Sequence, residues 1–226
     1  MHEIVQRLIL IDNQIKEESD KLEKSKKIKI VAISKTFSID SIMPLIDHGH
    51  IDFGENKIQE AKAKWADIKK NKPHLNLHFV GKLQTNKASD LVKLFDYCHS
   101  LESIKQAEIL SKLEKKLEKK LKYFVQINIG SEEQKSGINP NEANDFINLC
   151  INKYNLNVIG LMCLPPNDKL SKEYFTIMHN LKLSLFNSTS SKLVELSMGM
   201  SNDYIEAISS GSTYLRLGTK IFGERK

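Results

Sequence analysis

Short apolar runs alternate with amphipathic stretches along most of the chain. Eight of these runs are rich in β-branched and aromatic residues, the composition typical of buried strands. In chain order they are IKIVAIS at 28, HIDFG at 50, LHFVG at 77, FDYCHS at 95, YFVQINI at 123, NVIGLMCL at 157, KLVELSMG at 192 and STYLRLG at 212. The pattern therefore predicts eight strands separated by helices.

The stretches between the runs show helical spacing of their apolar residues. Ile58, Ala61 and Trp65 fall on one face of a predicted helix. The segment LSKLEKKLEKKLKYF at 110–124 has a stripe of leucines that extends to Leu121, with Glu and Lys opposite. A membrane-surface helix and a coiled-coil strand are alternatives, but the segment is too short to sustain a coiled coil. An outer helix of a barrel is the favoured interpretation.

The chain begins with a further amphipathic segment. Ile4, Leu8, Ile11 and Ile15 recur at helical intervals, which predicts an N-terminal helix within residues 1–24, packed on the rest of the fold. Acidic residues occur early in this segment, unlike the basic start and apolar block of a signal peptide.

Eight strand-helix units predict a parallel (β/α)8 TIM barrel, an α/β fold in a single domain that spans residues 1–226. A chain of 226 residues fits one barrel of minimal length, whereas two domains would each be small. An open doubly wound sheet is the alternative, but its glycine fingerprint is missing.

Composition excludes several classes of protein. The net charge of +6 comes almost wholly from lysine, with only three arginines, so a solvated surface is favoured over nucleic-acid binding. The three cysteines form no CxxC pair and indicate a reducing compartment. No segment approaches the roughly 20 apolar residues that span a bilayer. We therefore expect a cytosolic protein with no membrane or nucleic-acid partner.

Lys35 follows the first apolar run directly, ahead of Thr36 and Phe37. Barrel folds place their chemistry after the carboxyl ends of the strands, and a partly desolvated lysine can attack a carbonyl group. Considered alone, this run favours an ordinary solvated lysine.

Two glycine-containing turns follow the last two predicted strands, SMGMSND at 197–203 and RLGTKIFGER at 216–225. Barrels often bind phosphate at this place, through backbone N–H groups and hydroxyls. We expect Ser201 to cap a helix begun by Asn202 and Asp203 while its hydroxyl faces a ligand, with Gly218 and Thr219 completing a phosphate site. A plain N-cap and a plain turn are the alternatives.

Arg216 lies inside an apolar run of a chain that otherwise uses lysine. A buried salt bridge to an acid is one explanation, and a hydrogen bond to a heteroatom of a bound ring is the other. A lysine on the first strand, an arginine on the eighth and a phosphate site beside them together describe a pyridoxal phosphate site.

Six motifs of the chain resemble those of the pyridoxal phosphate homeostasis proteins, the YggS/PROSC family. They are VAISKTFS, FGENKIQEA, LHFVGKLQTNK, QINIGSEEQKSG, GLMCLPP and LSMGMSNDYIEAISSGSTYLRLGTKIFGER. The resemblance implies a barrel similar to the N-terminal domain of bacterial alanine racemase, with pyridoxal 5'-phosphate as a Schiff base on Lys35. It also implies phosphate contacts from Ser201, Gly218 and Thr219, Arg216 at the pyridine nitrogen, Asn56 near the ring, Met198 beside the site and, with less weight, Lys135 near the cofactor.

The resemblance implies a carrier in vitamin B6 homeostasis that supplies the cofactor to apo-enzymes, with no catalytic residue. We expect a monomer, because the expected site is complete within one chain; a dimer is the alternative. An arginine at the pyridine nitrogen weakens the ring as an electron sink, and similar racemases take a second acid/base tyrosine from an additional domain. A weak amino-acid racemase and a barrel for another phosphorylated metabolite are the alternatives. His48, His50, His74 and His78 lack the spacing of metal ligands, so we expect core or surface histidines and no metal.

Overall fold

The computed structural model describes residues 1–22, 27–130, 136–166, 168, 170–188 and 193–224. Its described residues form a closed barrel in which the eight strands pair in sequence order and β8 returns to β1. The strands are β1 (Lys29–Ile33), β2 (Asp52–Glu55), β3 (Asn76–Phe79), β4 (Tyr97–Leu101), β5 (Lys122–Ile127), β6 (Asn157–Cys163), β7 (Glu195–Ser197) and β8 (Tyr214–Leu217). Every neighbouring pair is parallel, which confirms the predicted barrel.

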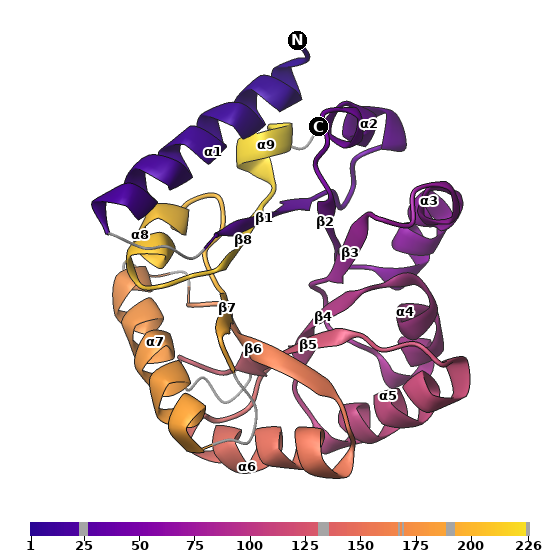
Figure 1. The fold of residues 1–226 in the computed structure, drawn as a ribbon, viewed down its shortest axis with the longest axis vertical. Coiled ribbons are helices and arrows are strands. Elements are labelled where there is room, and N and C mark those ends of the chain that lie inside the picture. Colours follow the sequence, from indigo (N-terminus) through magenta and orange to yellow (C-terminus); the bar gives the residue numbers. More distant parts are fainter. Residues whose placement is uncertain (23–26, 131–135, 167, 169, 189–192, 225–226) are drawn as a thin grey trace.

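Helices surround the strands on the outside (Figure 1). They are α1 (Glu3–Lys21), α2 (Ile39–Asp47), α3 (Ile58–Asn71), α4 (Ala88–Leu94), α5 (Ile104–Leu117), α6 (Ala143–Asn148), α7 (Ser171–Ser188), α8 (Tyr204–Ser209) and α9 (Thr219–Phe222), with short 3-10 or π-helical turns at Thr85–Lys87, Pro140–Glu142 and Leu149–Lys153. The predicted inner face of α3 is confirmed, because Ile58, Ala61 and Trp65 are its buried residues.

The N-terminal helix packs on the outside of the barrel. Helix α1 buries Ile4, Val5, Leu8, Ile11 and Ile15 and contacts α2, α8 and α9 (Figure 1). It ends at Lys21, whereas the sequence pattern extended the helical segment to residue 24; residues 23–26 lie outside the described part of the chain.

The predicted leucine-striped helix is wrong in its last turn. Helix α5 ends at Leu117, because Glu118 adopts a left-handed conformation at φ 49°, and Lys122 already begins β5. Glu114, expected on the polar face, is buried; its carboxylate accepts hydrogen bonds from the Leu121 backbone N–H at 2.7 Å and the Tyr123 hydroxyl at 2.9 Å. This carboxylate joins the end of α5 to the start of β5.

The core has an inner and an outer layer. A large cluster that includes Trp65, Phe53 and Phe175 lies between the strands and the helices. A smaller cluster inside the barrel consists of Val31, Ile33, Tyr97, Phe124, Met162 and Tyr214. Side chains of a strand alternate between the two layers, so polar residues at inward positions lie inside the barrel among apolar neighbours.

Candidate functional site at the carboxyl mouth of the barrel

The carboxyl ends of the strands bring the predicted site residues to one mouth of the barrel. Lys35 lies two residues after β1, and Asn56, Met198 and Gly218 directly follow β2, β7 and β8. Ser201 and Thr219 continue the last two turns. Because all eight strands are parallel, these positions share one end of the barrel. Lys135 lies outside the described residues.

Lys35 is flanked by two residues that other elements hold in place. Before it, the buried Ser34 hydroxyl donates to Glu55 Oε1 at 2.8 Å. After it, the Thr36 N–H donates to Glu60 Oε1 at 2.6 Å, and Thr36 has a φ of 70°. A β-branched residue in the left-handed region costs about 1–3 kcal/mol, so the surrounding contacts must impose this conformation. Such strain at a mouth of the barrel indicates a position under functional constraint.

A buried lysine on α3 ties these contacts together. Lys64 Nζ lies 2.9 Å from Glu55 Oε1, 2.9 Å from the Ser34 carbonyl oxygen and 3.3 Å from Glu60 Oε1. Burial raises the pKa of Glu60, but the Thr36 N–H and the Lys64 ammonium outweigh it, so the pKa is lower than usual. Glu60 therefore stays ionised and keeps accepting from Thr36. We call Glu55, Glu60 and Lys64 the Lys35 clamp.

The turns after β7 and β8 meet at one hydroxyl. Ser201 Oγ accepts hydrogen bonds from the backbone N–H groups of Gly218 and Lys220, each at 3.3 Å. The expectation that Ser201 caps the following helix is wrong, because α8 begins at Tyr204 with Asp203 in the capping position. Its hydroxyl is directed instead to the start of α9. Backbone N–H groups that converge on one oxygen form the kind of donor set that binds an anion.

Arg216 is buried inside the barrel. Its Nη1 donates to the carbonyl oxygen and the hydroxyl of Ser197, each at 2.7 Å, and its Nη2 donates to the Cys163 carbonyl oxygen at 2.8 Å. No carboxylate of the described residues lies within ion-pair distance, so the buried salt bridge considered from the sequence does not form there. A guanidinium has five N–H donors, so these bonds leave donors for a ligand.

Asn56 and Met198 occupy different environments. Asn56 is half-buried and lines a cavity of about 160 Å³, together with Lys57, Ile58, Gln59, Phe79, Lys82, Gln84 and Lys87. Gly81 passes close to it: a Cβ on Gly81 would lie 2.0 Å from the Asn56 carbonyl oxygen, so only glycine fits there. Met198 is completely buried in the outer core. The roles of both residues toward a cofactor stay predictions.

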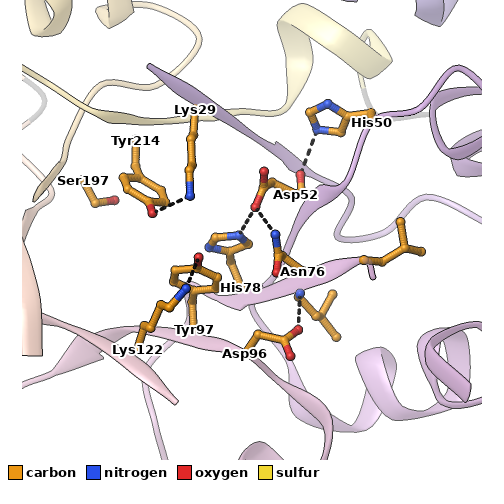
Figure 2. Close-up of polar contacts among 12 residues, drawn as sticks. Lys29, His50, Asp52, Asn76, His78, Asp96, Tyr97, Lys122, Ser197 and Tyr214 are labelled. Carbon is orange, nitrogen blue, oxygen red and sulfur yellow. Dashed lines mark hydrogen bonds and ion pairs between the residues drawn. The ribbon is translucent and has the colours of Figure 1, made fainter. Parts of the chain in front are cut away.

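Sequence reasoning missed a set of polar residues inside the barrel. His78, interpreted only as a core or surface residue, bonds to Asp52 Oδ1 at 2.9 Å and to His99 at 3.0 Å. At the amino end of the barrel, Lys29 donates to the Tyr214 hydroxyl at 3.0 Å and Lys122 to the Tyr97 hydroxyl at 3.1 Å (Figure 2). The available signal was the alternation of the strands, which turns these side chains inward.

Other kinds of site find little support in the described part of the chain. It contains no group of three or more His, Cys, Asp or Glu residues that could hold a metal ion. The three cysteines are free and buried, and burial raises the pKa of Cys98 to about 11 and that of Cys150 and Cys163 to about 12. These thiols are poor nucleophiles at neutral pH. Among the helices described, none is long and apolar enough to cross a membrane.

Comparison with known proteins agrees with the geometry. A model of the alanine racemase N-terminal domain matches residues 10–226. The pyridoxal phosphate homeostasis protein of Pasteurella multocida is 38% identical over 202 residues, covering 88% of this chain and 87% of the relative. That of Escherichia coli K12 is 31% identical over 229 residues, covering 100% and 98%.

Solved structures show the same fold. PipY of Synechococcus elongatus, in a structure with bound pyridoxal phosphate, superposes with a TM-score of 0.79 at 30% identity and covers 92% of this chain and 100% of that one. An alanine racemase of Clostridium difficile superposes with a TM-score of 0.73 at 18% identity, over 98% of this chain and 56% of the racemase. The second match supports the fold alone.

Proposed function

Because the chain belongs to the family of the alanine racemase N-terminal domain, we propose that it binds pyridoxal 5'-phosphate and acts in the homeostasis of this cofactor. The observation that carries the proposal is the convergence of the Gly218 and Lys220 N–H groups on Ser201, beside the strand that presents Lys35. A Cβ on Gly218 would lie 3.6 Å from Ile33, two residues before the lysine, so the turn after β8 packs against the end of the strand that leads to Lys35, which supports the proposal.

The residues present fit this cofactor. A lysine amine suits its aldehyde, and the Ser201–Gly218 turn suits its phosphate. A buried arginine that no carboxylate of the described residues approaches within ion-pair distance suits its ring nitrogen. Bound pyridoxal phosphate supplies a reactive aldehyde and an electron-withdrawing ring. The chain's own residues would anchor it covalently through Lys35 Nζ, hold the phosphate with Ser201, Gly218 and Thr219, and donate from Arg216 to the ring nitrogen.

The hydrogen bonds of the tyrosine hydroxyls favour a protein that binds the cofactor without substantial turnover. The Tyr97 and Tyr214 hydroxyls bond to lysines at the amino end of the barrel, opposite Lys35. The hydroxyls of Tyr123, Tyr174 and Tyr204 bond to Glu114, Asp168 and Gln14, respectively. A racemase needs a second acid/base group facing the lysine, and these five hydroxyls are engaged elsewhere. The protein would then be a cytosolic monomer that delivers the cofactor to apo-enzymes.

The visible absorption spectrum of the purified protein tests the proposal. We expect a yellow protein whose band bleaches on borohydride reduction and leaves a phosphopyridoxyl mass on the peptide that contains Lys35. A protein that stays colourless and unlabelled with excess cofactor would contradict it, and a barrel for another phosphorylated metabolite would become the better explanation. Exchange of an amino acid's α-proton with solvent would instead support the racemase.

A further inference from the structure

A continuous chain of hydrogen bonds crosses the barrel interior from Asp52 to Arg216. Asp52 Oδ1 lies 2.9 Å from His78 Nε2, and His78 Nδ1 lies 3.0 Å from His99 Nε2. His99 Nδ1 lies 2.8 Å from Ser197 Oγ, which accepts from Arg216 Nη1 at 2.7 Å. All five residues are buried, and they come from five different strands. We call Asp52, His78, His99, Ser197 and Arg216 the relay. Figure 2 shows its Asp52–His78 end.

Burial and partners determine the charge states along the relay. Burial lowers the pKa of His78 and His99, so both imidazoles are neutral near pH 7. Burial raises the pKa of Asp52, but its bonds from His78 and Asn76 and the nearby Lys29 outweigh this and lower it. Asp52 is therefore a carboxylate, and Arg216 is a cation at the other end.

These charge states allow one arrangement of the protons. The carboxylate of Asp52 only accepts, so His78 donates from Nε2 and, being neutral, accepts at Nδ1. His99 must then donate from Nε2 and accept at Nδ1. Ser197 consequently gives its hydroxyl proton to His99 and presents only lone pairs to Arg216, which can only donate. Because Asp52 can only accept and Arg216 can only donate, both ends require every hydrogen bond to be donated toward Asp52.

No carboxylate of the described residues accepts a hydrogen bond from Arg216, although Asp203 lies near enough for its charge to act on the guanidinium. Within the described residues its acceptors are the two oxygens of Ser197 and the Cys163 carbonyl, none of them charged. Besides His78, the titratable groups around Asp52 are Lys29, which bonds to Tyr214, and His50, which bonds to the Asp52 carbonyl oxygen at 2.9 Å and whose pKa burial lowers. The relay thus connects the guanidinium to a carboxylate at the opposite end of the barrel.

We propose that Asp52, His78, His99 and Ser197 are positioning residues that hold Arg216 in a single orientation, as a pure hydrogen-bond donor toward the ring nitrogen of the ligand. The ligand side of this inference rests on the proposed function. A guanidinium fixed in this way selects a ring nitrogen that carries no proton. The order of the protons within the relay belongs to the protein itself and exists without a ligand.

The first test is histidine ¹⁵N–¹H NMR of the unmodified protein without cofactor. The sequence has seven histidines; stacking identifies His78 by its contact with Tyr97, at 4.1 Å between centroids, and His99 by Phe124, at 4.3 Å. We expect both rings to be neutral with the proton on Nε2. A proton on Nδ1 of either ring, or an imidazolium at neutral pH, would overturn the proposal.

The second test is Ser197→Ala, which removes the hydroxyl between His99 and Arg216. Ser100→Ala is a matched control, because Ser100 is equally buried but its hydroxyl contacts Cys98 rather than the relay. We expect Ser197→Ala to shift the His99 Nδ1 resonance, to shift the absorption maximum of bound pyridoxal phosphate and to raise its dissociation constant about tenfold, the effect of about 1.4 kcal/mol. If the two variants had equal dissociation constants for pyridoxal phosphate and equal absorption maxima, the positioning role would be refuted.

The two tests separate this inference from the proposed function. If the histidine protons lie as expected but the protein takes up no pyridoxal phosphate, the proposed function and the ligand side of the inference fail while the relay stands. If the cofactor binds to Lys35 but a histidine has the other tautomer, the relay fails while the proposed function stands. The NMR measurement needs no variant, so it decides even where Ser197→Ala does not fold.

Discussion

Lys35 lies between two residues whose backbone the fold holds firmly. Ser34 is completely buried, and Thr36 is in the left-handed region with its N–H bonded to Glu60. The backbone on both sides of Lys35 is therefore restrained. An amine presented in this way is preorganised to meet a carbonyl group at the mouth of the barrel.

We expect Lys35→Ala to abolish borohydride-fixed labelling yet to retain weak, noncovalent binding of pyridoxal phosphate. The Ser201–Gly218 turn remains in this variant, and hydrogen bonds to a charged group contribute about 1.5–3 kcal/mol, so the phosphate ester should bind about tenfold or more tighter than pyridoxal. Equilibrium dialysis with both compounds measures the difference. Lys62→Ala, which changes an exposed lysine on α3, is the control. Equal affinity for the two compounds would show that the turn binds no phosphate.

At the scale of single elements, α3 does more than cover the barrel. Its inner face packs through Trp65, and its first turns supply Glu60 and Lys64 to the Lys35 clamp. Lys64 and Glu55 have only 9% and 0% of their side chains exposed, so their ion pair is shielded from solvent. A buried pair of this kind specifies geometry more than it adds stability. Here the geometry is that of the loop that carries Lys35.

Glu60→Gln should reduce stability near neutral pH by about 0.5–1 kcal/mol, because the amide keeps an acceptor for Thr36 but loses the charge that faces Lys64. The pKa of Glu60 is lowered in the folded state, so its contribution is complete above its unfolded pKa and is lost as pH falls through its folded pKa. Urea unfolding at about pH 7 and about pH 3.5 should show the difference from the unmodified protein shrinking on acidification. A difference that grows in acid would contradict this assignment.

Glu114→Ala tests the junction between α5 and β5. The substitution leaves the Leu121 N–H and the Tyr123 hydroxyl without their acceptor, at a cost of about 2–5 kcal/mol in the free energy of unfolding. Glu108→Ala on the same helix is the matched control, because Glu108 is exposed and forms a surface ion pair with Lys112; we expect a change within about 0.5 kcal/mol. Equal effects in urea titrations would mean that the buried carboxylate does not stabilise this junction.

At the scale of the whole molecule, α1 connects the outside of the barrel to the anion site. It packs on α8 and α9, the helices that follow the turns of Ser201 and Gly218 (Figure 1). The Tyr204 hydroxyl on α8 donates to Gln14 on α1 at 2.6 Å. The helix thus supports from behind the elements that present the phosphate donors.

Leu8→Ala should destabilise the protein by about 2–5 kcal/mol, because Leu8 is 3% exposed and its truncation leaves a cavity between α1 and the barrel. Leu10→Ala, at a position that is 63% exposed on the same helix, should change the free energy of unfolding by no more than about 0.5 kcal/mol. Urea titration of the two variants measures both values. Equal changes in the free energy of unfolding for the two variants would mean that α1 does not unfold cooperatively with the barrel.

Local patterns predicted the barrel well. Each strand is a short apolar run bounded by turn residues, and each long helix has one apolar face, so both signals lie within a window of a few residues. The end of α5 escaped prediction because the leucine stripe continues past Leu117, while the buried Glu114 carboxylate, bonded to residues seven and nine positions ahead, terminates the helix. A tertiary contact there overrode the helical periodicity.

The sequence by itself determined the order of eight strands and helices, the position of Lys35 after the first strand, that of Arg216 within the last strand, and the two glycine turns after the last two strands. Only the tertiary structure decided what these residues contact. Ser201 meets Gly218 across 17 positions, and His99 meets Ser197 across 98. Periodicity reflects which face of an element is buried, but barrel closure and register set which inward side chains meet, and these depend on the whole chain.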